Sequence, residues 1–170
     1  IFAGAIALVP VVGFSLFPKS EKPMFLVNIE MPNGTNIHAT NEVTRDVERV
    51  LRSKGSVIRN FSTNVGKGNP RIYYNVTQRN EAENFAQIFV QLQPETGTKE
   101  KIAVIDDLRE RLNHIAGVKI EVKDFEQGPP IDAPLAYRIY GEDLDTLRAV
   151  AARIETLLKR TGGTLYVNNP

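Results

Sequence analysis

The chain has 170 residues, of which 42% are hydrophobic and 24% charged, a composition typical of a globular protein with one or two cores and not of a disordered chain. Its 21 basic and 20 acidic residues leave a formal net charge of +1, so no bulk positive charge indicates binding to nucleic acid or to an anionic surface. It has no cysteine, which excludes disulfides, thiolate metal sites and a cysteine nucleophile.

Residues 1–18 contain no charged side chain, and Lys19, Glu21 and Lys22 follow at once. An apolar run with charges at its end is typical of a helix that leaves a bilayer, although a full span needs about 20 residues. The basic start and small-residue cleavage site of a signal peptide are missing. We therefore expect residues 1–18 to be the end of a transmembrane helix whose start is missing. The alternative is an apolar strand or arm of the core.

After Pro23 one unit recurs three times: an alternating strand, a loop, an amphipathic helix and a second strand. In the first unit we predict a strand at 25–31, a helix at 40–54 and a strand at 57–65. Thr40 is the expected N-cap and Gly55 the C-terminal stop. The apolar positions of this unit, expected to face the core, are Phe25, Val27, Ile29, Met31, Val43, Val47, Val50 and Leu51.

The second unit is predicted to have a strand at 85–92, a helix at 99–115 and a strand at 118–122. The apolar stripe of its helix comprises Ile102, Ile105, Leu108, Leu112 and Ile115. The third unit is predicted to have strands at 135–140 and 164–167 around a helix at 143–160.

One such unit cannot bury its helix stripe and its sheet face alone, but two can, as a split βαββαβ sandwich of the ferredoxin-like α+β class. We therefore expect residues 19–127 to form one complete subdomain. Residues 128–170 form the first half of a second one, and its partner is either another copy or a segment outside these 170 residues.

Several motifs are spread over residues 32–144 in a characteristic order. They are Pro32-Asn33-Gly34-Thr35, Val65-Gly66-Lys67-Gly68-Asn69-Pro70-Arg71, Asn84-Phe85-Ala86-Gln87, Glu126-Gln127-Gly128-Pro129-Pro130-Ile131-Asp132-Ala133-Pro134 and Arg138-Ile139-Tyr140-Gly141-Glu142-Asp143-Leu144. In order and spacing they resemble the periplasmic porter region in the C-terminal half of a bacterial resistance-nodulation-division (RND) efflux transporter.

The resemblance implies a proton-driven multidrug exporter of hydrophobic or amphiphilic compounds in the bacterial inner membrane, with this segment mainly periplasmic and attached through residues 1–18. It also implies a homotrimer that docks to a periplasmic adaptor and an outer-membrane channel. The carboxylates that carry protons would belong to transmembrane helices outside this sequence. No cofactor and no metal is expected.

The resemblance also implies that the loop beginning at Val65 corresponds to the family's switch loop, which lies between two substrate pockets. Gly66 and Gly68 suit such a loop because glycine tolerates large changes of φ and ψ. Aromatic rings suit a pocket for varied amphiphiles, since burial of apolar area discriminates weakly between ligands. The alternative is a surface loop without ligand contact. The predicted substrate-binding residues are Phe61, Gly66, Lys67, Gly68, Asn69, Tyr73, Phe125, Gln127, Pro129 and Ile131.

Phe89 ranks behind these aromatics as a candidate. The segment through Gln127, Pro129 and Ile131 is alternatively no more than a rigid linker between subdomains, because its prolines stiffen it in either case.

Other functions have weaker support in the sequence. No dyad or base–nucleophile pair is apparent, so we expect no enzyme activity. The loop at 65–68 lacks the spacing of a phosphate-binding loop. Export of a heavy-metal cation needs converging soft ligands, and only Met24 and Met31 offer thioethers. A soluble ligand- or RNA-binding module would expose aromatic and basic residues together, whereas these strands alternate apolar residues with Glu, Asn and Gln. A membrane-anchored scaffold without transport is the remaining alternative.

Overall fold

The computed structural model describes residues 19–128, 135–164, 166, 167 and 169. The chain divides at Pro130 into two compact units, which are treated separately below. The expected transmembrane segment at 1–18 lies outside the described residues. Among the helices that are described, none has the length and hydropathy needed to cross a bilayer.

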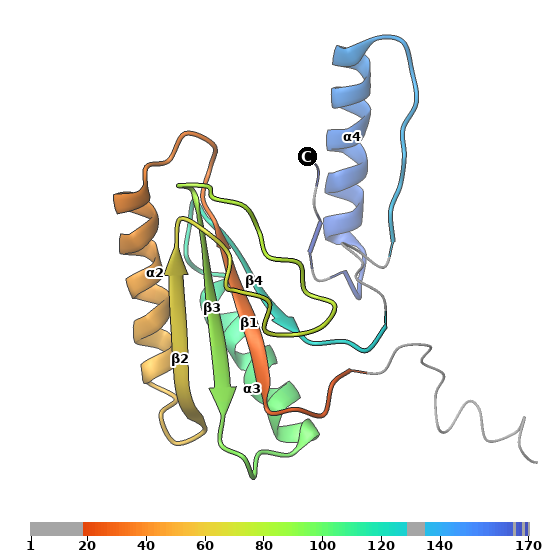
Figure 1. The fold of residues 1–170 in the computed structure, drawn as a ribbon. Helices are drawn as coiled ribbons and strands as arrows, with labels where there is room; N and C mark the ends of the chain where they lie inside the picture. Colours follow the sequence, from red (N-terminus) through yellow and green to blue (C-terminus); the bar gives the residue numbers. More distant parts are fainter. Residues whose placement is uncertain (1–18, 129–134, 165, 168, 170) are drawn as a thin grey trace, which may run out of the picture. The chain divides into compact units, whose positions relative to one another are not determined.

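The first unit is a four-stranded antiparallel sheet with two helices on one face (Figure 1). Its elements are β1 (Met24–Glu30), α2 (Ile37–Arg52), β2 (Ile58–Val65), β3 (Phe85–Leu92), α3 (Thr98–Leu112) and β4 (Lys119–Asp124). The strand order is β2-β3-β1-β4, so each helix connects two strands that are not neighbours. This is the order of a split βαββαβ sandwich, and the predicted ferredoxin-like class is confirmed.

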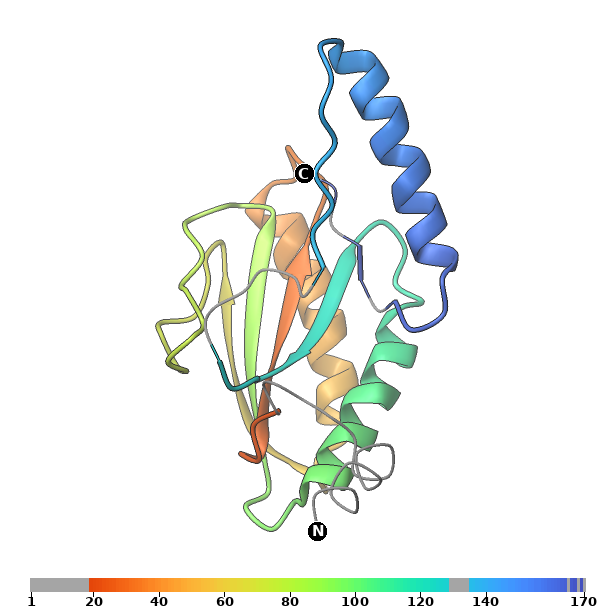
Figure 2. The same ribbon diagram turned by 90° about the vertical axis from the view of Figure 1, so that its right-hand side faces the viewer.

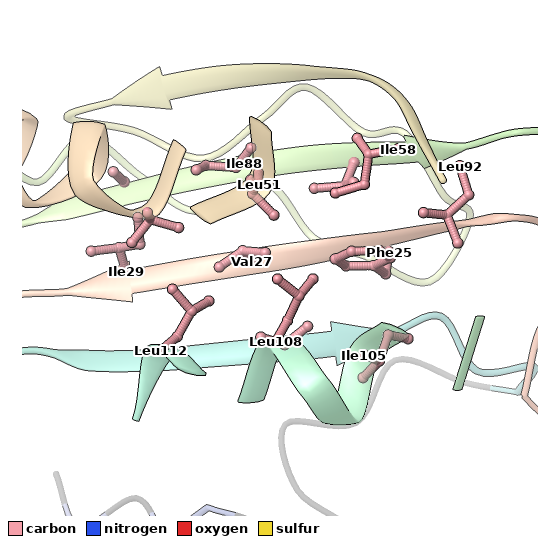
Figure 3. Packing of buried hydrophobic residues seen from close by; sticks show 14 residues of the cluster. Phe25, Val27, Ile29, Leu51, Ile58, Ile88, Leu92, Ile105, Leu108 and Leu112 are labelled. Atoms are coloured by element: carbon pink, nitrogen blue, oxygen red, sulfur yellow. The ribbon is translucent and has the colours of Figure 1, made fainter. Parts of the chain in front are cut away.

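The core lies between the sheet and the two helices. Phe25, Val27 and Ile29 alternate along β1 toward the helices, opposite Val90, Ile88 and Ala86 of β3. Figure 3 shows these β1 side chains facing Leu108 and Leu112 of α3 and Leu51 of α2. The predicted alternation of β1 is therefore confirmed up to Ile29, whereas Met31 lies beyond the strand and is only half-buried.

Helix α2 begins earlier than predicted because its N-cap is Asn36 and not Thr40. The side chain of Asn36 accepts a hydrogen bond from the Ala39 amide at 2.9 Å. Thr40 lies one turn inside the helix, fully buried, and its hydroxyl donates to the Glu83 carbonyl oxygen at 2.7 Å. Asn and Thr are both common caps, so composition alone could not choose between them.

The buried stripe of α3 differs from the prediction at its first position. Ile105, Leu108 and Leu112 are buried as expected, but the residue one turn before them in the core is Lys101, and Ile102 is only half-buried. Because lysine is strongly hydrophilic, an apolar stripe identified by hydropathy does not include this core position. Its buried counter-ion is described with the site below.

In the second unit, the structure describes α4 (Leu144–Arg160). Its N-cap is Asp143, whose side chain accepts from the Thr146 amide at 2.7 Å. The strand predicted at 135–140 is not formed. Of the strand predicted at 164–167, residue 165 lies outside the described residues, and the other three carry no strand. A strand requires a neighbour for its hydrogen-bond ladder, and hydropathy alternation alone does not supply one.

Candidate functional site

The candidate site is the face of the sheet opposite the helices, here called the open face. Alternate residues of each strand lie on this face, and the strand register shows which they are. Leu26 and Asn28 of β1 pair with Phe89 and Gln87 of β3. The same two β3 residues pair with Ser62 and Asn64 of β2. In Figure 2 the sheet is seen with α2 and α3 on one side and the segment between β2 and β3 on the other. That segment, residues 66–84, is here called the covering loop.

Two hydrogen bonds close the base of the covering loop. The Gly66 amide donates to the Phe85 carbonyl oxygen at 2.8 Å, and the Ala82 amide donates to the Gly66 carbonyl oxygen at 2.9 Å. Gly66 has a φ of 83°, in the left-handed region that favours glycine. Gly68 is required for a different reason: a Cβ at this position would lie 2.8 Å from the backbone nitrogen of Arg79, so a side chain would push the two arms of the loop apart.

A row of amide side chains attaches the covering loop to the middle of the open face. The Asn69 backbone amide donates to Gln87 Oε1 at 2.8 Å, Gln87 Nε2 donates to Asn28 Oδ1 at 2.8 Å, and Asn28 Nδ2 donates to Glu121 Oε2 at 2.9 Å. Asn64 Nδ2 also donates to Asn69 Oδ1. This amide row crosses all four strands, and it holds Asn69 almost completely buried.

An aromatic cluster lies at the end of the open face where β1 begins. Tyr73 of the covering loop stacks on Phe125, with ring centroids 4.7 Å apart, and Phe89 lies 6.4 Å from Phe125. Leu26 is buried beneath them, and Met24 and Val76 pack at the margin. The Lys22 ammonium group lies 6.0 Å from the centre of the Tyr73 ring, within range of a weak cation–π contact.

A third attachment holds the returning arm of the loop. The Arg79 guanidinium pairs with Glu30 at 3.1 Å and lies 4.5 Å above the Phe85 ring. Lys119 Nζ approaches the same carboxylate at 3.9 Å. Because Arg79 and Glu30 are both well exposed to solvent, this pair contributes little to stability and opens readily.

The structure separates the predicted site residues into three groups. Gly66, Gly68, Asn69, Tyr73 and Phe125 all lie at the covering loop or beneath it, and Lys67 is exposed on the same loop. Gln127 is exposed beyond β4, while Pro129 and Ile131 lie outside the described residues.

The structure places Phe61 apart from the covering loop. This residue packs against the helix-side core, opposite Val90 in the register and under the Arg52 guanidinium at 5.6 Å. The expectation that it joins the loop aromatics was wrong, because alternation along β2 turns it to the other face. Phe89, which ranked lower in the sequence, lies in the aromatic cluster instead.

A buried ion pair beside the site was not expected from the sequence. Lys101 Nζ lies 2.9 Å from Asp124 Oδ1, and the two side chains are 0% and 3% exposed. Lys101 also donates to the Ser20 carbonyl oxygen, and Asp124 Oδ1 accepts from the Phe125 amide at 2.9 Å. Within the described part of the chain, Asp124 Oδ2 is buried without a hydrogen-bond partner. No group of three His, Cys, Asp or Glu residues that could hold a metal ion occurs among the described residues.

The fold is that of a ferredoxin-like subdomain, with one face of its sheet under a long loop. A family model described as the AcrB/AcrD/AcrF family matches residues 1–169. The chain therefore belongs to this family of RND transporters, and the resemblance carried by its motifs is confirmed.

Two solved structures of a heavy metal efflux pump are similar to this chain. Crystal form II matches with a TM-score of 0.59 and 18% identity over 95% of this chain and 18% of that chain. Crystal form I matches with a TM-score of 0.62 and 19% identity over 94% of this chain and 17% of that chain. At this identity the likeness shows a shared fold. The chain thus spans less than a fifth of that pump's length. No curated protein matches the chain.

Proposed function

We propose that this chain is the periplasmic porter part of a proton-driven exporter of hydrophobic or amphiphilic compounds, and that the aromatic cluster under the covering loop contacts the exported compound. The chain itself would bind and guide compounds without catalysing a reaction. The intact protein would lie in the bacterial inner membrane as a homotrimer, together with a periplasmic adaptor and an outer-membrane channel.

The observation that carries the proposal is the composition of the covered surface. Tyr73, Phe89 and Phe125 offer ring faces, and the side chains of Asn28, Asn69 and Gln87 beside them offer uncharged donors and acceptors. A surface of this kind binds by apolar area with few obligatory polar contacts, which suits varied amphiphilic ligands.

Phe89 and Phe61 provide a matched test of the proposal. Both rings are half-buried on neighbouring strands, but Phe89 faces the covering loop and Phe61 faces the helices. Binding of the apolar fluorophore N-phenylnaphthylamine to the 170-residue chain is measured for F89L and F61L. Since an aromatic contact contributes about 0.5–1.5 kcal/mol, we expect F89L to raise Kd about twofold to tenfold and F61L to leave it unchanged. Equal effects of the two variants, or no binding at all, would contradict the proposal.

Export of a heavy-metal cation is the second candidate, because the two similar structures are of a heavy metal efflux pump. A soft ion would favour thioether ligands, and Met24 packs at the margin of the aromatic cluster. Titration calorimetry with silver(I) tests this candidate. Under our proposal no saturable binding is expected. Saturable binding that M24L abolishes would favour metal export instead.

A further inference from the structure

The tip of the covering loop contacts the segment that leads out of the first unit. Asn75 Nδ2 donates to the carbonyl oxygens of Glu126, at 2.8 Å, and of Gly128, at 3.1 Å. The Gly128 amide donates to the Tyr74 hydroxyl at 2.7 Å. Residues 126–128, here called the exit segment, are thus joined to two consecutive residues of the loop by three hydrogen bonds.

The chain just before the exit segment is held rigidly from the opposite side. Asp124 pairs with the buried Lys101, and the Phe125 carbonyl oxygen accepts from the Ser20 amide at 2.7 Å. An isolated bridge between Lys19 and Glu126 extends this pairing by one residue. Gly128 then has a φ of 122°, a conformation that glycine adopts most readily. Beyond Glu126, therefore, the described contacts that hold the chain in place are its hydrogen bonds to Tyr74 and Asn75 of the covering loop.

Besides the Tyr73–Phe125 stack, the covering loop is attached to the sheet by polar contacts that can be broken at low cost. The amide row and the exposed Arg79–Glu30 pair are polar, and their hydrogen bonds contribute little net stability because they can be exchanged for hydrogen bonds to water. Arg71, Tyr74 and residues 77–81 are exposed. The loop is therefore the movable partner, and the end of β4 is the fixed one.

We infer that Asn75, with Tyr74, couples the position of the covering loop to the path of the exit segment, so that release of the loop from the open face also releases Gln127 and Gly128. Asn75 is a positioning residue in this inference. Its amide group offers two N–H donors to two carbonyl oxygens that are two residues apart, which a carboxylate could not do. The inference rests on the proposed function in which the covering loop gives access to the aromatic cluster.

The test measures the exit segment while perturbing the loop at a distance from it. Because the chain has no cysteine, pairs of spin labels can be placed at Ser56 and Thr77 to follow the loop, and at Ser56 and Gln127 to follow the exit segment. All three positions are exposed. Distances are measured by pulsed electron spin resonance on the full 170-residue chain in detergent, without any ligand.

The perturbing variant is N69A/R79A. It removes the hydrogen bonds of the Asn69 side chain with Asn64 and with the Gln87 carbonyl oxygen, and it removes the Arg79–Glu30 pair, but it removes no contact to residues 126–128. We expect both distance distributions to broaden and to shift, the one to Gln127 included. In an N75A/Y74F background the distribution to Gln127 is already broad, and N69A/R79A broadens it no further. Glu81→Ala, at an exposed position of the loop without a described contact to Tyr74, Asn75 or the exit segment, is the control and leaves the distribution to Gln127 unchanged.

An unchanged distribution to Gln127 in N69A/R79A overturns the inference, whether the loop moves alone or does not move at all. Circular dichroism establishes that each variant is folded, and N69A alone is the milder variant if the double one is not. Since no ligand is used, the outcome is independent of the N-phenylnaphthylamine test. If the spin-label distances change as expected but the N-phenylnaphthylamine test fails, the coupling stands and the proposed function is contradicted.

Discussion

Lys101 occupies a core position that the neighbouring turns of α3 fill with Ile105, Leu108 and Leu112. Its ammonium group is completely buried and has two oxygen partners, Asp124 Oδ1 and the Ser20 carbonyl. A buried ion pair of this kind contributes little net stability, because desolvation offsets the attraction between the charges. Removal of one partner is costly, however, because the other charge remains buried alone.

The variant K101M is therefore expected to lower the free energy of unfolding by about 3–5 kcal/mol, since it leaves the Asp124 carboxylate buried without its counter-ion. The double variant K101M/D124L is expected to recover most of this loss, because it removes both charges. Urea unfolding followed by circular dichroism measures both variants. K99M on the exposed first turn of α3 is the control, with a change within about 0.5 kcal/mol. A double variant as unstable as K101M would show that the pair has a role other than charge compensation.

Residues of this kind mark the limit of prediction from the sequence. From the sequence, a lysine at the first position of an apolar stripe indicates that the apolar face ends there. Its partner Asp124 is 23 residues away, and only the folded sheet brings the two side chains together. Phe61 and Phe89 show a related limit. Each alternates correctly within its own strand, but which face receives the covering loop depends on the connection between strands and not on either residue.

At the scale of elements, the six helices and strands of the first unit were predicted to within a few residues, because each has a clear apolar period. The contacts of the covering loop were not predictable in the same way. Asn28, Gln87 and Asn64 are ordinary polar positions of half-buried strands, and their amide row depends on the register between β1, β2 and β3. Sequence analysis identified the loop by its glycines, whereas its attachments depend on long-range pairing.

Helices α2 and α3 are linked at their surface by Asp107. Its Oδ2 lies 2.9 Å from Lys54 Nζ, just beyond α2, and 2.9 Å from Arg111 Nε. The hydrogen bond from Lys54, followed by the one from Arg111, lowers the pKa of Asp107 below its ordinary value of 3.8. Because the folded pKa lies below the unfolded one, this stabilisation is present above pH 3.8 and is lost as the pH falls through the lowered pKa.

The variant D107N is accordingly expected to be less stable than the unsubstituted chain at neutral pH, and this difference should shrink as the pH falls below 3.8. Urea unfolding at a series of pH values between neutral and acidic measures it. K54M removes the hydrogen bond that contributes most to the lowered pKa of Asp107, so it should reduce the pH dependence. High salt should also weaken this dependence, because the charged groups are at the surface. A difference between D107N and the unsubstituted chain that is constant with pH would show that the charge of Asp107 is not responsible.

At the scale of the whole molecule, the two units differ in how far their apolar side chains are buried. The first unit encloses its helix stripes against four strands, whereas none of the described residues of α4 in the second unit is buried. Large apolar side chains of that unit are strongly exposed, among them Leu135 at 72%, Tyr140 at 82% and Leu157 at 66%. Apolar surface of this extent favours association with another surface.

We therefore expect the chain to self-associate through the second unit, to a degree that apolar-to-polar substitution there reduces. Sedimentation velocity in a fixed detergent concentration compares the chain with L135S/Y140S/L157S, and the variant should shift the distribution toward smaller species. Residues 1–18 are the same in both proteins, so any association through them cancels in the comparison. I37S, which replaces an apolar residue exposed to 38% in the first unit, is the control and should leave the distribution unchanged. An identical shift in both variants, or in neither, would show that the exposed side chains of the second unit do not drive association.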